Sequence, residues 1–164
     1  MRYIALSALA AVALYGCAPV PTQQNVHYPP FPEAEYQTLP RIGDATVTGQ
    51  VFLKTRGGDV KVGAGSEIQL FPVTSYSKVF YKAYQSKLPI DTPDPRVRQY
   101  TFRTQADATG SFDFKQVPAG QYYIGGLVTW EAPSKYGLAS QGGYIAKEIT
   151  VAPGSSQKVM LTEQ

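Results

Sequence analysis

The chain has 164 residues, of which 43% are hydrophobic and 16% charged, a balance that fits one globular domain with a single core. Its 15 basic and 12 acidic residues give a net charge of only +3, and no basic cluster stands out, which argues against a nucleic-acid partner. The 12 tyrosines, 13 prolines and 15 glycines favour strands and turns over long helices, because aromatic residues suit a pleated surface whereas proline and glycine interrupt helices.

The N-terminal residues 1–16 are typical of a secretory signal peptide. Arg2 provides the positive start, and residues 4–14 form an apolar stretch within the range of about 7 to 15 residues that signal peptides use. A membrane-spanning helix needs about 20 apolar residues, so this stretch is too short to cross a bilayer. We therefore expect residues 1–16 to be absent from the mature protein.

The sequence has a single cysteine, Cys17, directly after this segment. Leu14-Tyr15-Gly16-Cys17 resembles the lipobox of bacterial lipoproteins, which implies cleavage between Gly16 and Cys17 and acylation of Cys17. In the Gram-negative lipoproteins that it resembles, an Asp at the next position retains the protein in the inner membrane, so Ala18 implies a lipid anchor in the outer membrane, with the domain facing the periplasm. The alternative is an uncleaved or ordinarily cleaved signal followed by a structural cysteine.

Residues 18–44 contain six prolines and few aliphatic residues, so we expect an extended tether that buries no face. Together with the acylated Cys17 they form the predicted linker, residues 17–44. His27 is expected to be solvated there rather than to bind a metal. An alternative is that the tether carries a short docking motif, formed by Val26, Tyr28, Phe31 and Tyr36.

From residue 45 onward, apolar and polar residues alternate in short runs separated by turn sequences, which is the pattern of β-strands. Asp107-Ala108-Thr109-Gly110 is a turn sequence, because Asp can accept hydrogen bonds from the nearby backbone and Gly tolerates a positive φ. We expect this turn to join a hairpin between a strand with Phe102 and a strand with Phe112. About seven strands are predicted, at 45–54, 66–71, 97–104, around Phe112 and Phe114, and at 122–130, 144–151 and 157–161.

The same alternation predicts which side chains form the core. On the strand after the turn, Phe112 and Phe114 lie on one face, while Ser111 and Lys115 lie on the other. Gly125-Gly126, inside an otherwise apolar strand, indicates a bulge or a close approach of another backbone segment. The side chains expected to be buried between two sheets are Val51, Leu70, Phe112, Phe114, Tyr122 and Ile124.

The segment from Thr104 to Tyr122, T-x-x-D-A-x-G-x-F-x-F-x-x-V-P-x-G-x-Y, resembles the repeat of carboxypeptidase regulatory-like domains, transthyretin-like β-sandwiches that accompany zinc carboxypeptidases and many bacterial surface proteins. The resemblance extends from about Ala45 to Thr162, apart from an insertion. It implies an all-β fold for residues 45–164: a transthyretin-like seven-stranded β-sandwich with one short helical insertion. The family has no single function, so the function must be argued from sites.

The insertion covers about residues 75–96, and its apolar residues recur at helical spacing between Tyr76 and Lys87. We expect the insertion to carry the contact with a partner protein, because many unrelated proteins share the sandwich strands. The alternative is that Tyr76, Val79, Phe80 and Tyr84 only pack the helix onto an open sheet edge. The predicted partner-binding residues are Tyr76, Lys78, Tyr81 and Lys82.

The sequence offers no recognisable catalytic set. A zinc carboxypeptidase needs His and Glu ligands, which a single histidine in a tether cannot supply. Serine catalysis lacks a histidine base in the domain, so a Ser-Lys pair without a supporting motif stays open. Asp91, Asp94, Asp107 and Asp113 could offer oxygens to calcium, but Asp is common in such turns for local backbone reasons. We therefore expect no catalytic residues, no metal and no cofactor.

These patterns together favour a lipid-anchored, non-enzymatic envelope lipoprotein whose domain binds, or helps to assemble, another envelope protein. A lipoprotein that binds carbohydrate or another small ligand is the alternative, and an enzyme without a recognised motif is a third reading. Exposed aromatic surfaces paired with acidic groups would favour the sugar binder, whereas a broad apolar patch would favour a protein partner.

Overall fold

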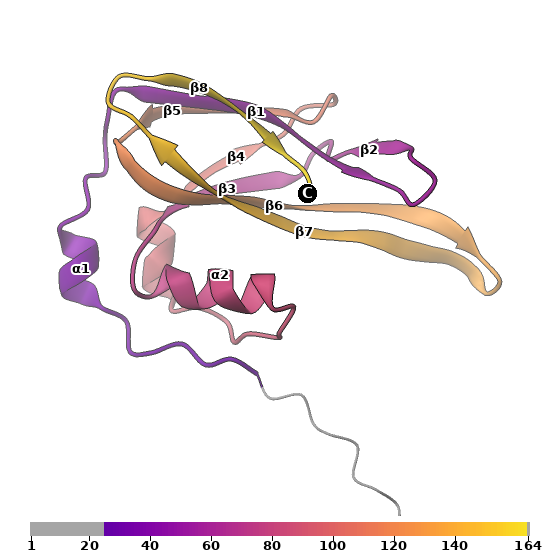
Figure 1. Cartoon of the computed structure of the whole chain (residues 1–164), viewed down its shortest axis with the longest axis horizontal. Helices are drawn as coiled ribbons and strands as arrows, with labels where there is room; N and C mark the ends of the chain where they lie inside the picture. The colour runs from indigo at the N-terminus through magenta and orange to yellow at the C-terminus, as the bar shows by residue number, and fades with distance from the viewer. Residues whose placement is uncertain (1–24, 164) are drawn as a thin grey trace, which may run out of the picture.

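The computed structural model describes residues 25–163, which form two β-sheets and a layer of short helices (Figure 1). In the first sheet, β1 (Ala45–Lys54) pairs antiparallel with β5 (Ser111–Val117) and parallel with β8 (Ser156–Leu161). The short β2 (Val60–Val62) pairs antiparallel with the last residues of β1. The predicted strand at 45–54 is therefore confirmed, and it is the strand that organises this sheet.

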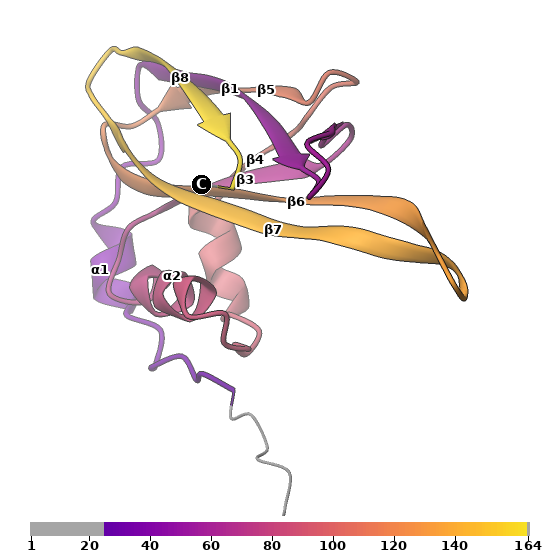
Figure 2. The ribbon, with the colours of Figure 1, turned by 45° about the vertical axis from the view of Figure 1, so that its right-hand side comes forward.

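The second sheet is antiparallel and has the order β4 (Phe102–Gln105), β3 (Glu67–Pro72), β6 (Gly120–Ser134) and β7 (Gly137–Val151). The last two strands have 15 residues each and pair along their whole length. Their far half extends beyond the rest of the sandwich as a two-stranded arm (Figure 2). The described chain thus has eight strands rather than the predicted seven, because the sequence pattern missed β2.

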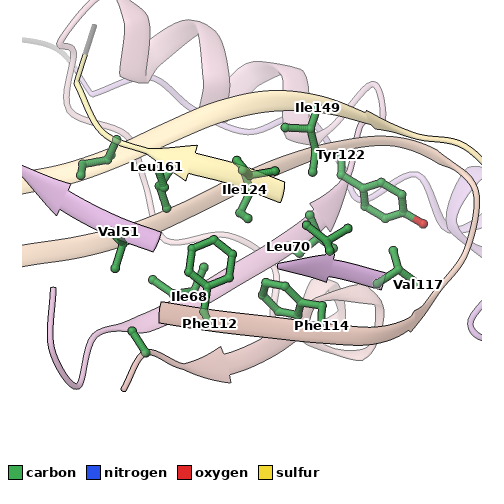
Figure 3. Close-up of a cluster of buried hydrophobic side chains, with 14 of the residues drawn as sticks. Val51, Ile68, Leu70, Phe112, Phe114, Val117, Tyr122, Ile124, Ile149 and Leu161 are labelled. Carbon is green, nitrogen blue, oxygen red and sulfur yellow. The ribbon is translucent and has the colours of Figure 1, made fainter. Parts of the chain in front are cut away.

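The core lies between the two sheets, and its side chains come from alternate positions of the strands (Figure 3). Every second residue of β1, from Ala45 to Leu53, is buried. The six predicted core residues are all buried, which confirms the predicted register: Val51, Leu70, Phe112, Phe114, Tyr122 and Ile124.

The predicted turn at Asp107–Gly110 is present, but the predicted hairpin is wrong. The Asp107 Oδ1 atom accepts hydrogen bonds from the backbone N–H of Thr109 at 2.8 Å and of Ser111 at 2.9 Å, and Gly110 has a φ of 77°. The strands on either side pair elsewhere: β4 with β3 in the second sheet, and β5 with β1 in the first. The turn therefore carries the chain from one sheet to the other.

The predicted strand at 97–104 is also wrong in its first half. Residues Pro95–Tyr100 form a 3-10 helix, η1, and β4 begins only at Phe102. The Asp94 side chain accepts a hydrogen bond from the backbone N–H of Arg96, and Pro95 occupies the first helical position, where its missing N–H costs nothing. Tyr100 consequently packs against Tyr36, outside the sandwich core.

The third layer contains α1 (Glu33–Gln37), α2 (Ser77–Gln85) and η1, which lie on the side of the second sheet that faces away from β1 (Figure 1). The predicted helix in the insertion is confirmed as α2. None of the helices in the described part of the chain has both the length and the hydrophobicity needed to cross a bilayer.

The expectation of an extended tether up to residue 44 is wrong for residues 25–44. Tyr36 on α1 is only 2% exposed, and its Oη accepts a hydrogen bond from Thr74 Oγ1 at 3.0 Å. The aromatic residues of this segment supply apolar surface that a proline-rich composition does not reveal, so the segment packs onto the domain. The predicted signal peptide, the cleavage site at Gly16 and Cys17, and Ala18 lie outside the described residues.

Candidate ligand-binding pocket

A pocket of about 540 Å³ lies between the helical layer and the outer face of the second sheet. Its floor comes from β3, β4 and β7, and its walls come from α2, the 90–98 segment and the N-terminal segment. This volume is within the range of about 300 to 1,000 Å³ that small-ligand sites occupy. Six aromatic side chains line it: Tyr28, Tyr36, Phe71, Tyr76, Phe80 and Tyr144.

The packing of α2 on the sheet shapes one side of this pocket. The ring of Phe80 meets Phe71 on β3 and Tyr144 on β7 edge to face, with centroid distances of 5.6 and 5.8 Å. Tyr144 can lie across β6 because Gly125 has no side chain, and a Cβ at that position would collide with the Tyr144 ring. The sequence predicted a bulge or a close backbone approach here, whereas the group nearest to Gly125 is the Tyr144 side chain. The helix covers a face of the sheet rather than the open edge that the alternative reading gave it.

The N-terminal segment forms another wall. Tyr28 stacks on Tyr76 with a centroid distance of 4.4 Å and an interplanar angle of 11°. The backbone fixes this position, because the Val26 N–H donates to the Pro89 carbonyl at 2.8 Å and the Asp91 N–H donates to the Val26 carbonyl at 3.1 Å. The residues of the alternative docking motif therefore pack against the chain's own domain.

The acidic groups at the pocket are held by hydrogen bonds. Asp91 accepts from the side chains of His27 and Asn25, and the hydrogen bond from His27 is the main cause that lowers the pKa of Asp91. Hydrogen bonds from the side chain and backbone of Arg96 lower the pKa of Asp94 to about 2. Both carboxylates are therefore ionised at neutral pH and can accept hydrogen bonds from a ligand.

The tyrosines provide the complementary donors. Burial, together with smaller contributions from the neighbouring Tyr76, Tyr36 and Asp91, raises the pKa of Tyr28 to about 12. Burial also raises the pKa of Tyr144. These phenols keep their protons at neutral pH, so they present both a flat apolar ring and a hydroxyl group.

The structure separates the four predicted partner-binding residues. Tyr76 is only 3% exposed and is part of the pocket wall, where its Oη accepts a hydrogen bond from the Asp94 N–H at 2.8 Å. Tyr81 stacks on the buried Tyr123 of β6, with a centroid distance of 4.2 Å, so its ring faces the sheet and not a partner protein. Of these four residues, only Lys78 and Lys82 are exposed, because the aromatic side chains cover the sheet.

Sequence reasoning missed most of the pocket. Its polar residues Gln69, Arg98 and Arg103 come from two strands and a 3-10 helix that are adjacent only in the folded chain. The available signal was the density of aromatic residues among the prolines of the N-terminal segment. Within residues 25–163, no group of three or more His, Cys, Asp or Glu side chains is arranged to hold a metal ion.

No family model and no curated protein matches the chain. Among solved structures, the chain is similar to the crystal structure of a protein from Pseudomonas aeruginosa that is described as "a putative carbohydrate binding protein". The two chains are 33% identical and superpose with a TM-score of 0.74. The match covers 83% of this chain and 99% of the Pseudomonas chain.

Proposed function

We propose that this chain, which belongs to the same family as the Pseudomonas aeruginosa protein, binds carbohydrate in the aromatic pocket under α2 without changing it chemically. The observation that carries the proposal is the composition of the pocket, which combines six aromatic rings with ionised and amide side chains. The description of the similar protein supports the same ligand class.

The two kinds of side chain match the two kinds of surface on a sugar ring. The C–H groups of a pyranose form an apolar face, which packs against a flat aromatic ring such as Tyr28 or Tyr144. The hydroxyl groups at the ring edge both donate and accept hydrogen bonds, so they suit the acceptors Asp91 and Asp94 and the donor Arg98. A purely apolar ligand would desolvate these charged groups without offering them further hydrogen bonds.

Binding of the purified full-length protein to an array of mono- to hexasaccharides tests the proposal directly. We expect at least one glycan to bind, and we expect Tyr28→Ala to weaken that binding on the order of tenfold, because the substitution removes one aromatic wall. Tyr28 suits the test because it belongs to the N-terminal segment and not to the sandwich core.

Tyr136→Ala is the matched control. Tyr136 is 86% exposed at the tip of the arm and does not line the pocket, so its removal should leave glycan binding unchanged. An array on which no glycan is bound would refute the proposal. Glycan binding that is insensitive to Tyr28→Ala would place the site elsewhere on the molecule.

A protein partner on α2 is the second candidate function. The exposed Lys78 and Lys82 support it, since they lie one helical turn apart on the side of α2 that does not touch the sheet. Lys78→Glu with Lys82→Glu should abolish co-purification of an envelope protein without lowering the melting temperature. Unchanged co-purification would remove this candidate, and glycan binding should be the same in either case.

A lipid anchor at Cys17 remains part of the proposed function. The lipobox-like sequence at 14–17 supports acylation, and Ala18 supports an outer-membrane location with the domain facing the periplasm. The anchor would be followed by only a few residues before Val26 joins the pocket wall. A ligand in this pocket would therefore be held close to the membrane surface.

A further inference from the structure

A second pocket, of about 410 Å³, lies on the same outer face of the second sheet. It is an open depression beyond the end of the helical layer, between the 62–66 loop and strands β3, β6 and β7. Two side chains, Gln69 and Tyr144, line both this second pocket and the aromatic pocket. The two pockets are therefore neighbours that share a wall.

The strand register explains why they adjoin. Gln69 on β3 pairs with Gly125 on β6, and Leu127, two residues further along β6, pairs with Tyr144 on β7. Residues two apart on a strand point to the same face, so these positions form successive rows across one surface. The strand residues that line the second pocket lie next to those that α2 covers.

The shared wall is flanked by charged side chains that solvent can reach. Gln69 Nε2 donates to Glu67 Oε1 at 2.6 Å, and Arg103 approaches the same carboxylate at 3.5 Å. The side chains of Glu67 and Arg103 are 55% and 41% exposed. A linear ligand can therefore pass over this wall and form hydrogen bonds with these side chains, directly or through water.

The second pocket repeats the chemistry of the first. Leu127 and Tyr144 give it an apolar side, and the Leu127 side chain, which is 54% exposed, is accessible to a ligand. Ser66, Glu67 and Thr129 give it hydroxyl and carboxylate groups. This combination again suits a sugar ring better than a purely apolar or a purely charged ligand.

We infer that the ligand is a linear oligosaccharide of at least two sugar rings, which runs from the aromatic pocket over Gln69 and Tyr144 into the second pocket. This inference rests on the proposed function and adds the ligand class to it. It makes chain length, and not only the identity of one sugar, a determinant of affinity, because the second pocket contributes contacts only to a longer ligand.

Isothermal titration with the full-length protein tests the inference on the glycan series that the array identifies. The mono-, di-, tri- and tetrasaccharides of that series are compared. We expect the affinity to rise on the order of tenfold or more once the chain is long enough to reach the second pocket. Equal affinity for the monosaccharide and the longer chains overturns the inference but leaves the proposed function intact, whereas an array without any bound glycan overturns both.

A double variant locates the gain in affinity. Ala64→Leu with Thr129→Leu fills the second pocket with branched side chains that offer neither a hydrogen bond nor an aromatic ring, and neither residue lines the first pocket. We expect the long chains to bind this variant only as well as the short ones, with the affinity for the short ones unchanged.

The matched control is Ala152→Leu with Thr150→Leu, which makes the same changes at exposed positions that line none of these pockets. The control should retain the full gain with chain length. If the pocket-filling variant stays folded, as judged by its melting temperature, and also retains the gain, then the long chain runs in another direction and the inference is wrong.

Discussion

Tyr28 and Tyr76 stack face to face, with ring centroids 4.4 Å apart and planes inclined by 11°, although 48 positions separate them in the sequence. One ring comes from the segment that follows the predicted lipid anchor, and the other comes from the start of the insertion in the sandwich. This contact joins two parts of the chain that the sequence presents as a free tether and an independent helix. The pocket exists because they meet.

The first prediction concerns this contact. Tyr28→Ala should loosen the N-terminal wall, because only two backbone hydrogen bonds, between Val26 and Pro89 and between Asp91 and Val26, then hold its first residues. Amide hydrogen exchange should become faster at Val26 and Asp91 and stay slow at core positions such as Val51. Unchanged exchange at both N-terminal wall amides would mean that the stacked rings do not hold the segment.

The second prediction concerns the core. Phe112→Ala or Phe114→Ala should lower the free energy of unfolding by about 3 to 5 kcal/mol, because each leaves a cavity between the two sheets (Figure 3). Chemical denaturation measures this change. Lys115→Ala on the exposed face of β5 is the control, and its effect should stay within about 0.5 kcal/mol.

The third prediction concerns Gly125. An alanine there would collide with the Tyr144 ring, so we expect Gly125→Ala to displace that ring and to lower the free energy of unfolding by about 1 to 3 kcal/mol. Glycan binding should weaken as well, since Tyr144 lines both pockets. Gly143→Ala is the matched control, because a Cβ at Gly143 meets no atom within 4 Å. Equal stability of the two variants would contradict the prediction.

The fourth prediction concerns acid pH. Hydrogen bonds from Arg96 lower the pKa of Asp94 to about 2, below its ordinary value of 3.8. A carboxyl with a lowered pKa stabilises the folded state above its unfolded pKa, and that contribution disappears as the pH falls through the folded pKa. Urea denaturation should therefore show Asp94→Asn less stable than the unmodified protein at pH 6, with the two curves converging between about pH 4 and pH 2. A difference that is the same at every pH would exclude this ionic contribution.

The fifth prediction concerns processing. Intact mass should show a mature protein that begins at an acylated Cys17, and Cys17→Ser should release the protein into the soluble fraction. The physical reason is that each buried methylene group stabilises membrane attachment by about 0.8 kcal/mol, so several acyl chains hold the protein firmly. A mature protein with an unmodified cysteine, or with residues 1–16 retained, would contradict the lipoprotein interpretation.

The sequence by itself determined the local features of the domain. Alternation of apolar residues identified β1 and the burial of Phe112 and Phe114, since successive side chains of a strand point to opposite faces. Helical spacing identified α2, and the Asp107–Gly110 sequence identified a turn. Each of these signals depends only on residues that are close to one another in the sequence.

Only the tertiary structure decided which elements are neighbours. The pattern around Asp107 is the same whether the turn closes a hairpin or carries the chain between sheets, because backbone hydrogen bonds to a distant strand leave no local trace. Likewise, nothing near Tyr28 indicates that Tyr76 will cover it. The pocket gathers side chains from strands β3, β4 and β7, from α2 and from the N-terminal segment, so its chemistry arises only when long-range packing brings these elements together.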